Sequence, residues 1–275
     1  MSFPIFFKKR KRGGEDDQSF LNLTITTTAS PQTVRIQQLT PQIDSTIDWG
    51  DGTTTLIVAN RTSVIDKTYA TAGVYKVKVE NPDRIVNLDL RVPTIGGLNT
   101  RDLRNAPMTG TFLLTSLGTG CVLDSAYMVD WRPSDWRLSG MPAGTYTINS
   151  ADMTDWRPTT WVLYTMPAAG SSYTFAASCM RAWITVRELK ANSLGITTAT
   201  VNTIIADVYA GRATYTWNTP VLDVGGATND SPSGIYQNPR GAPTSPLEQV
   251  FVLANDSNSE GIKKWTITWN GGSAP

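Results

Sequence analysis

The feature that most limits how this chain can fold is a segment that occurs twice, 25 residues apart. Ser125–Pro133 reads SAYMVDWRP and Ser150–Pro158 reads SADMTDWRP. The match continues downstream, where it pairs Trp136 with Trp161, Leu138 with Leu163 and Met141-Pro142 with Met166-Pro167. A unit of this size cannot bury its own apolar face, whereas stacked copies can, so the repeat predicts a solenoid.

Two weaker copies flank this pair, Ala106–Leu113 before it and Ala177–Trp183 after it. Stacked copies place equivalent residues one strand spacing apart, about 4.8 Å. We therefore expect an inward ladder of Met128, Met153 and Met180 and a second ladder of Trp131, Trp156 and Trp183. Asp130 and Asp155 would repel each other unless Arg132 and Arg157 lie between them, where their guanidinium groups could also stack on Trp.

The row formed by Trp136 and Trp161 leaves two interpretations open. On the surface, these rings could stack against sugars or contact a protein; inside, they would fill the core, which is the more usual role of a large aromatic side chain. Cys121 and Cys179 lie in different copies at positions that are not equivalent. We expect them to be small buried thiols.

The composition excludes several classes of enzyme. The chain of 275 residues has no His and only two Cys, which excludes Ser-His-Asp and Cys-His catalysis, imidazole metal sites and Cys-rich zinc sites. Only 17% of its residues are charged, whereas 38 are Thr, a residue that suits pleated β-sheets. We expect a mainly β protein without a cofactor.

The first folded unit begins at about Phe20, where apolar and polar residues start to alternate with the period of a half-buried strand. Asp51-Gly52 between two β-prone runs predicts a hairpin. Residues 20–92 resemble the polycystic-kidney-disease (PKD) family through Trp49-Gly50-Asp51-Gly52 and, downstream, Tyr69, Gly73, Tyr75, Val77 and Val79. The resemblance implies an immunoglobulin-like β-sandwich that acts as a spacer or adhesion module. Asp48 and Asp51 could form a metal pair, but we expect Asp51 to cap the turn and Trp49 to pack in the core.

After the repeats, the pattern predicts a helix over residues 200–211, because Val201, Ile204, Ile205 and Val208 have helical spacing and Gly211 follows. A strand at residues 221–226, a loop from about 227 to 245, and a closing hairpin of 248–253 with 264–269 complete the chain. Residues 95–240 resemble leucine-rich-repeat-like proteins of bacteriophage genomes and bacterial surfaces, through the late helix, the strand ending in Gly225-Gly226 and the Pro232-Ser233-Gly234 turn. The individual repeats depart from a plain leucine-rich consensus.

The N-terminal arm concentrates positive charge. The formal net charge is only +1, but one block of five basic residues is followed by 19 further basic against 23 acidic residues elsewhere. Apolar residues precede the basic block, the reverse of a secretory signal peptide, so we expect no such signal. The arm could be a mobile tail or a nucleic-acid patch; our interpretation is a docking peptide that anchors the chain to a partner through Phe6, Phe7, Lys8, Lys9, Arg10, Lys11 and Arg12.

These observations predict an arm at 1–18, a PKD-like β-sandwich at 19–92, a leucine-rich-repeat-like solenoid with one late helix at 93–226, and a loop with a capping β-hairpin at 227–275. The function that fits best is a non-enzymatic virion structural protein of a bacteriophage. Its partners would be other virion proteins, copies of itself and a host surface glycan, without a membrane span or a specific nucleic acid. The alternatives are a bacterial cell-surface adhesin or carbohydrate-binding module, and a glycan-active enzyme that uses Asp130 and Asp155.

Overall fold

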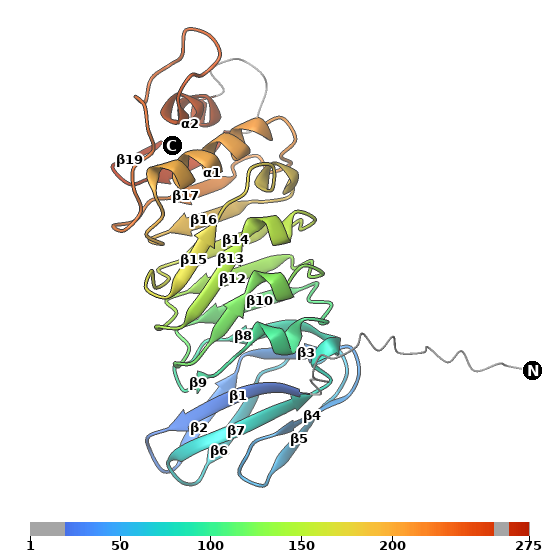
Figure 1. The fold of residues 1–275 in the computed structure, drawn as a ribbon. Helices are drawn as coiled ribbons and strands as arrows, with labels where there is room; N and C mark the ends of the chain where they lie inside the picture. The colour runs from blue at the N-terminus through green and yellow to red at the C-terminus, as the bar shows by residue number, and fades with distance from the viewer. Residues whose placement is uncertain (1–19, 256–263, 275) are drawn as a thin grey trace, which may run out of the picture.

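The β-strands form an elongated stack, with the N-terminal strands at one end and the C-terminal helices at the other (Figure 1). The structure is a computed structural model and describes residues 20–255 and 264–274. Those residues form 19 strands, five short 3₁₀ helices and two α-helices, so the prediction of a mainly β chain is confirmed. None of the helices in this part of the chain is long and apolar enough to cross a membrane.

Residues 20–90 supply the first eight strands. Leu21, Leu23 and Ile25 of the first strand are buried and alternate with more exposed residues, as their period of two predicts. Four of these strands join β9 in a sheet of order β5-β4-β7-β1-β9, while β2 pairs with β6. The bounds are β1 (Phe20–Thr27), β2 (Gln32–Ile36), β3 (Gln38–Pro41), β4 (Ser45–Asp48), β5 (Thr54–Ile57), β6 (Ile65–Tyr69), β7 (Gly73–Glu80) and β8 (Ile85–Leu90), with the 3₁₀ helix η1 (Pro82–Arg84) before β8.

The predicted hairpin connects β4 and β5, which pair antiparallel. Gly50 is required here, because it has φ +73° and a Cβ would lie 2.5 Å from the carbonyl oxygen of Lys76. Asp51 Oδ1 accepts the backbone N–H of Thr53 at 3.0 Å, and its Oδ2 pairs with Lys67 Nζ at 2.6 Å. Trp49 is buried, so the expected roles of turn cap and core residue are both confirmed. Burial alone would raise the pKa of Asp51, but hydrogen bonds from Lys67 and Thr53 outweigh it and lower that pKa to about 2.

The repeats form coils whose strands build two parallel sheets. One contains β10, β12, β14 and β16, and the other contains β11, β13 and β15. A 3₁₀ turn closes each coil. The bounds are β9 (Ile95–Gly96), η2 (Thr100–Leu103), β10 (Thr111–Thr115), β11 (Val122–Asp124), η3 (Ser125–Tyr127), β12 (Asp135–Ser139), β13 (Thr145–Asn149), η4 (Ser150–Met153), β14 (Thr160–Tyr164), β15 (Ser171–Thr174), η5 (Met180–Ala182) and β16 (Glu188–Asn192).

A single nine-stranded sheet runs through the stack in the order β19-β18-β17-β16-β14-β12-β10-β8-β3. Strand β8 pairs antiparallel with β3 on one side and parallel with β10 on the other. The sheet therefore crosses the predicted boundary at residues 92 and 93. An antiparallel strand closes each end, and Pro41 at the end of β3 limits pairing with a further strand.

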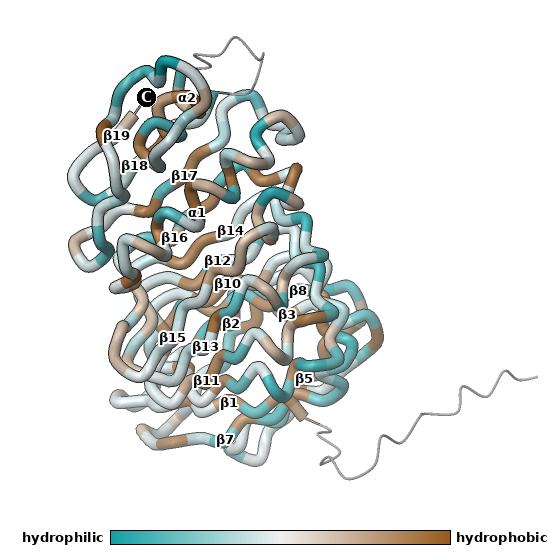
Figure 2. Tube along the Cα trace, turned by 45° about the horizontal axis from the view of Figure 1, so that its top comes forward, coloured by the Kyte–Doolittle hydropathy of each residue, from teal (hydrophilic) through white to brown (hydrophobic). Residues whose placement is uncertain are grey.

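The side chains of the repeat stack in the interior. Met128, Met153 and Met180 are fully buried, as are Trp131, Trp156 and Trp183, so both ladders face inward as expected. Figure 2 shows hydrophobic residues recurring along the strands of successive coils. The copy that precedes the pair has a different register from the one its Met suggests. Asn99 and Thr100 of its turn correspond to Asp124 and Ser125, which places the buried Leu103 of η2 at the equivalent of Met128, whereas Met108 lies in the segment before β10.

A ladder of buried hydroxyl groups joins one coil to the next. Thr100, Ser125 and Ser150 are fully buried, and each hydroxyl accepts a backbone N–H from the following coil. The donors are Asp124 N at 2.8 Å, Asn149 N at 2.9 Å and Ala176 N at 2.8 Å. The residue before each hydroxyl caps the 3₁₀ turn: Asn99, Asp124 and Asn149 accept N–H bonds from two residues downstream.

The C-terminal end contains α1 (Thr198–Ala210), β17 (Val221–Val224), α2 (Pro246–Asn255), β18 (Thr266–Trp269) and β19 (Gly272–Ala274). Helix α1 and strand β17 agree with the prediction, and Gly211 caps α1. The prediction of a single late helix and of a hairpin between 248–253 and 264–269 is wrong. Residues 248–253 lie in α2. Ser245 precedes this helix as a hydroxyl cap, and the Pro246 and Glu248 that follow it also favour helix initiation. The closing hairpin instead joins β18 and β19.

Candidate functional site

The predicted anchoring residues Phe6, Phe7, Lys8, Lys9, Arg10, Lys11 and Arg12 lie outside the described residues. The same holds for the arm at 1–18 as a whole. The candidate surfaces of the described residues therefore belong to the stack itself.

The interpretation of Trp136 and Trp161 as a surface platform is wrong. Both side chains are fully buried, and their rings stack with centroids 5.1 Å apart and planes 20° apart. They occupy inward positions of β12 and β14, two residues before the buried Leu138 and Leu163, because side chains on a strand alternate between its faces. This row fills the core, the alternative that the sequence had left open.

Arg132 and Arg157 lie at the exposed side of the 3₁₀ turns and are held in the same way. Nη1 of Arg132 donates to the carbonyl oxygens of Val129 and Trp131, and Nη1 of Arg157 donates to those of Thr154 and Trp156. Arg132 Nη2 also lies 3.4 Å from Asp155 Oδ2, so Arg132 does offset the charge of the neighbouring Asp. The predicted stacking of these two guanidinium groups on Trp is not found: in the described part of the chain, the arginines placed over rings are Arg187 and Arg212.

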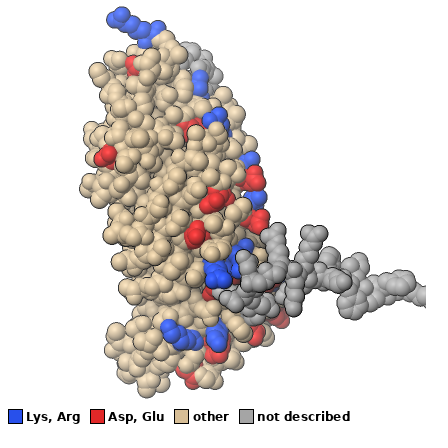
Figure 3. Space-filling view, viewed as in Figure 1, with Lys and Arg blue, Asp and Glu red and all other residues tan. Residues whose placement is uncertain are grey.

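Charged side chains follow one edge of the stack, whereas much of the face turned to the viewer carries none (Figure 3). The solvent face of the nine-stranded sheet has ion pairs of its own. Arg137 Nε lies 2.7 Å from Asp135 Oδ1 and its Nη1 lies 3.5 Å from Glu188 Oε2, while Lys190 Nζ lies 2.7 Å from Glu188 Oε1. Partly exposed pairs of this kind contribute only about 0–1 kcal/mol each. Arg137 and Lys190 thus offset the charges of Asp135 and Glu188, while Asp223 of the same sheet accepts hydrogen bonds from the Asn192 amide.

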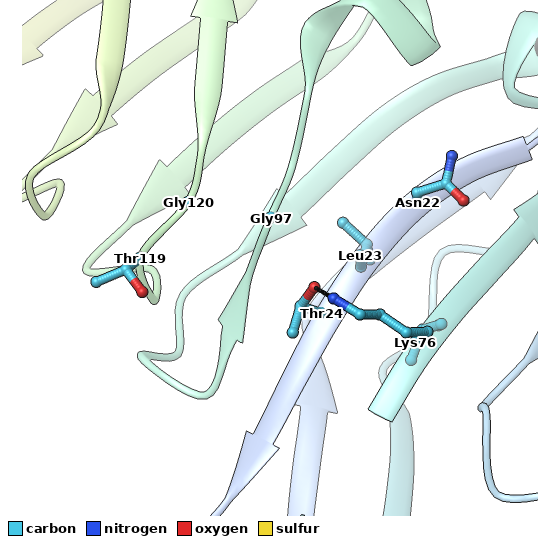
Figure 4. A pocket seen from close by; sticks show the side chains of 8 residues that line it. Asn22, Leu23, Thr24, Lys76, Gly97, Thr119 and Gly120 are labelled. Atoms are coloured by element: carbon cyan, nitrogen blue, oxygen red, sulfur yellow. Dashed lines mark hydrogen bonds between the residues drawn. The ribbon is translucent and has the colours of Figure 1, made fainter. Parts of the chain in front are cut away.

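A pocket of about 420 Å³ lies where the first unit meets the solenoid (Figure 4). Lys76 Nζ donates to Thr24 Oγ1 at 3.1 Å across its floor. The remaining lining consists of Asn22, Leu23, Val77, Gly97, Thr119 and Gly120. The pocket holds one amine and no carboxylate, so it lacks the acid and base pair that proton-transfer catalysis uses.

The buried titratable groups have structural roles. Asp207 of α1 is nearly inaccessible and accepts backbone N–H bonds from Ser178 and Met180, both at 2.6 Å. Cys121 and Cys179 are free and buried, as expected, and burial raises the pKa of both thiols. Within residues 20–255 and 264–274, no group of three or more Cys, Asp or Glu is arranged to hold a metal ion.

Comparison with known proteins leaves the chain without an assigned relative. No protein-family model, no curated protein and no solved structure matches it.

One exposed side chain was missed by the sequence reasoning. Trp217 follows η5 and β16, outside the 25-residue period, and 40% of it is exposed. The repeat gives no signal for this residue, because no other coil has an equivalent. Its isolation from the Trp ladders was the only indication that its role differs.

Proposed function

We propose that this chain is a non-enzymatic structural protein of a bacteriophage virion, as a capsid decoration, head-fibre or tail-associated subunit. The proposal that the chain is not an enzyme is supported by the hydrogen bonding of its buried polar side chains. Each buried Ser, Thr, Asn, Asp and Glu residue of the described part has a hydrogen-bond partner within the fold, and the hydroxyl ladder, Asp207 and Asn229 all bond the backbone. The buried side-chain atoms left without a partner are mainly indole N–H groups, those of Trp136, Trp156, Trp161 and Trp265. An active site normally keeps such groups available for substrate.

The continuous sheet supports a mechanical role. Because β8 belongs both to the first unit and to the solenoid sheet, forces on one end are transmitted to the other through backbone hydrogen bonds. We propose that the first unit is a PKD-like, immunoglobulin-like sandwich and that the coils are a leucine-rich-repeat-like solenoid. The hairpin at Gly50 and the parallel register of the coils support these two proposals.

The bacteriophage part rests on the resemblance of residues 95–240 to leucine-rich-repeat-like proteins of phage genomes. On this proposal the arm at residues 1–18 anchors the stack to another virion protein, and copies of the chain pack beside one another on the particle. The protein would reside in the virion, which is assembled in the host cytoplasm.

The test is incorporation into particles. Phage purified from a culture that expresses the tagged full-length chain should contain it by mass spectrometry, and a chain lacking residues 1–14 should be absent from particles although it remains folded. Capsid or tail genes beside its own gene would agree with this result. Full-length protein found only on the bacterial surface would instead support an adhesin and would refute the virion proposal.

A further inference from the structure

Trp217 differs from every other Trp of the chain in its exposure. Eight of the nine Trp residues are at most 9% exposed, whereas Trp217 is 40% exposed. A large aromatic ring left at the surface costs free energy, since burying it would remove apolar area from water. An exposed ring at a fixed position is a common feature of binding sites.

The ring is exposed but rigidly held. Trp217 Nε1 donates to the carbonyl oxygen of Thr185 at 2.6 Å, and the preceding Thr216 donates its N–H and its hydroxyl to the carbonyl oxygen of Ile184 at 2.9 and 3.0 Å. One residue earlier, the buried Tyr215 packs edge-on against Trp265 with ring centroids 4.9 Å apart. The ring is thus positioned before any ligand arrives, which lowers the entropy lost on binding.

The arginine beside this ring lacks an acidic partner. The guanidinium carbon of Arg187 lies 5.7 Å from the centroid of the Trp217 ring. Thr185, whose carbonyl oxygen accepts the indole N–H, donates its own hydroxyl to the backbone carbonyl oxygen of Arg157 at 2.9 Å, which ties this corner to the preceding coil. Arg187 is exposed and forms no salt bridge with a carboxylate of the described residues, unlike Arg132 with Asp155.

An exposed aromatic ring beside a guanidinium group without an acidic partner favours a ligand that has both an apolar face and a negative charge. We propose that Trp217 and Arg187 form a binding site for an acidic saccharide. The apolar face of a sugar ring would pack on the exposed indole, and a carboxylate or sulfate group would accept charge-assisted hydrogen bonds from the guanidinium group of Arg187. Single-stranded nucleic acid fits less well, because successive bases need successive aromatic side chains and this corner has one. The site is independent of the attachment of the arm to a particle.

The test uses the purified full-length chain on an array of uronate, sialylated and sulfated oligosaccharides, each beside its neutral counterpart. We expect retention on acidic members and at least about tenfold weaker binding to their neutral counterparts, since a hydrogen bond to a charged group is worth about 1.5–3 kcal/mol. Trp217→Ala and Arg187→Gln should each weaken binding about tenfold. The second variant changes only an exposed side chain, so it remains informative even if Trp217→Ala disturbs the fold.

Two matched variants test whether binding depends only on exposed positive charge or only on exposed aromatic surface. Arg132→Gln removes an exposed arginine that already has an acidic partner, and Tyr164→Ala removes an exposed ring from the sheet face; both should bind as the parent does. Binding to no acidic saccharide, equal binding by Arg187→Gln and the parent, or preferential binding of a thymidine 20-mer would each overturn the proposal.

Discussion

Asn229 joins three segments of the last coils, and its removal should destabilise the protein strongly. The side chain is 2% exposed, and Oδ1 accepts the N–H groups of Leu194 at 2.8 Å and Ile196 at 3.4 Å. Nδ2 donates to the carbonyl oxygens of Ala191 at 2.7 Å and Val224 at 3.0 Å. One amide thus satisfies four backbone groups that have no access to water.

The structure sets the expected size of the effect. Asn229→Ala leaves two buried N–H and two buried C=O groups without this partner, and each unsatisfied group costs about 1–3 kcal/mol. Because a water molecule can enter the vacated space and restore part of the bonding, we expect a net loss of about 3–5 kcal/mol in the free energy of unfolding. At about 2–4 °C per kcal/mol for a chain of this size, the melting temperature should fall by roughly 6–20 °C.

The assay is urea unfolding followed by fluorescence, with thermal melting beside it. Asn238→Ala is the matched control, because this Asn lies in the same loop with its side chain exposed. Asn229→Asp keeps the acceptor but replaces the donor with an oxygen that faces two carbonyl oxygens, so it should also destabilise at pH 7 and recover partly near pH 4, where the acid can donate. A loss below about 1 kcal/mol for Asn229→Ala would refute the reasoning.

Three further outcomes follow from buried and paired groups. Trp161→Ala should lower the free energy of unfolding by about 3–5 kcal/mol in urea titrations, because it opens a cavity in a fully buried row. The pKa values of Asp51 and Glu248 are lowered to about 2 by hydrogen bonds to their carboxylates, which for Asp51 outweigh the raising effect of burial. Their stabilising contribution should be complete above about pH 4.5 and decline as pH falls toward 2, as acid-titrated melting temperatures would show. Cys121 and Cys179 should resist a thiol reagent at pH 8 until the chain unfolds, since burial raises both thiol pKa values; rapid labelling of the native protein would contradict this.

The periodicity of the sequence predicted the interior of the coils well. The Met ladder and the ladder of Trp131, Trp156 and Trp183, whose members are 25 and then 27 residues apart, lie in the interior because equivalent residues of successive coils must pack against each other. The repeat could not decide which face Trp136 occupies, since a periodic residue can lie inside or outside. Trp136 lies two residues before the buried Leu138 of the same strand. Side chains two residues apart on a strand share a face, so Trp136 lies in the core.

The errors at the two ends of the repeat have a common physical cause. In the copy that precedes the pair, Leu103 and Ala106 replace the Met and Trp, so the visible Met108 suggested the wrong register. At the other end, residues 246–255 pack on α1 rather than on another coil, and a helix that covers the end of a stack has no copy to repeat. Local signals such as Ser245 followed by Glu248 are then the only sequence information available.

A sequence repeat therefore predicts the packing of residues that contact their own copies in neighbouring coils. It carries little information about residues that contact other parts of the fold. Thr100, Ser125 and Ser150 recur because every coil must offer an acceptor to the next one. Trp217 has no such constraint, yet its ring is fixed by hydrogen bonds and remains exposed. Packing within the fold alone does not account for an exposed indole beside an arginine without an acidic partner. In a stacked fold of this kind, exposed aromatic residues outside the period are the positions at which binding should be tested first.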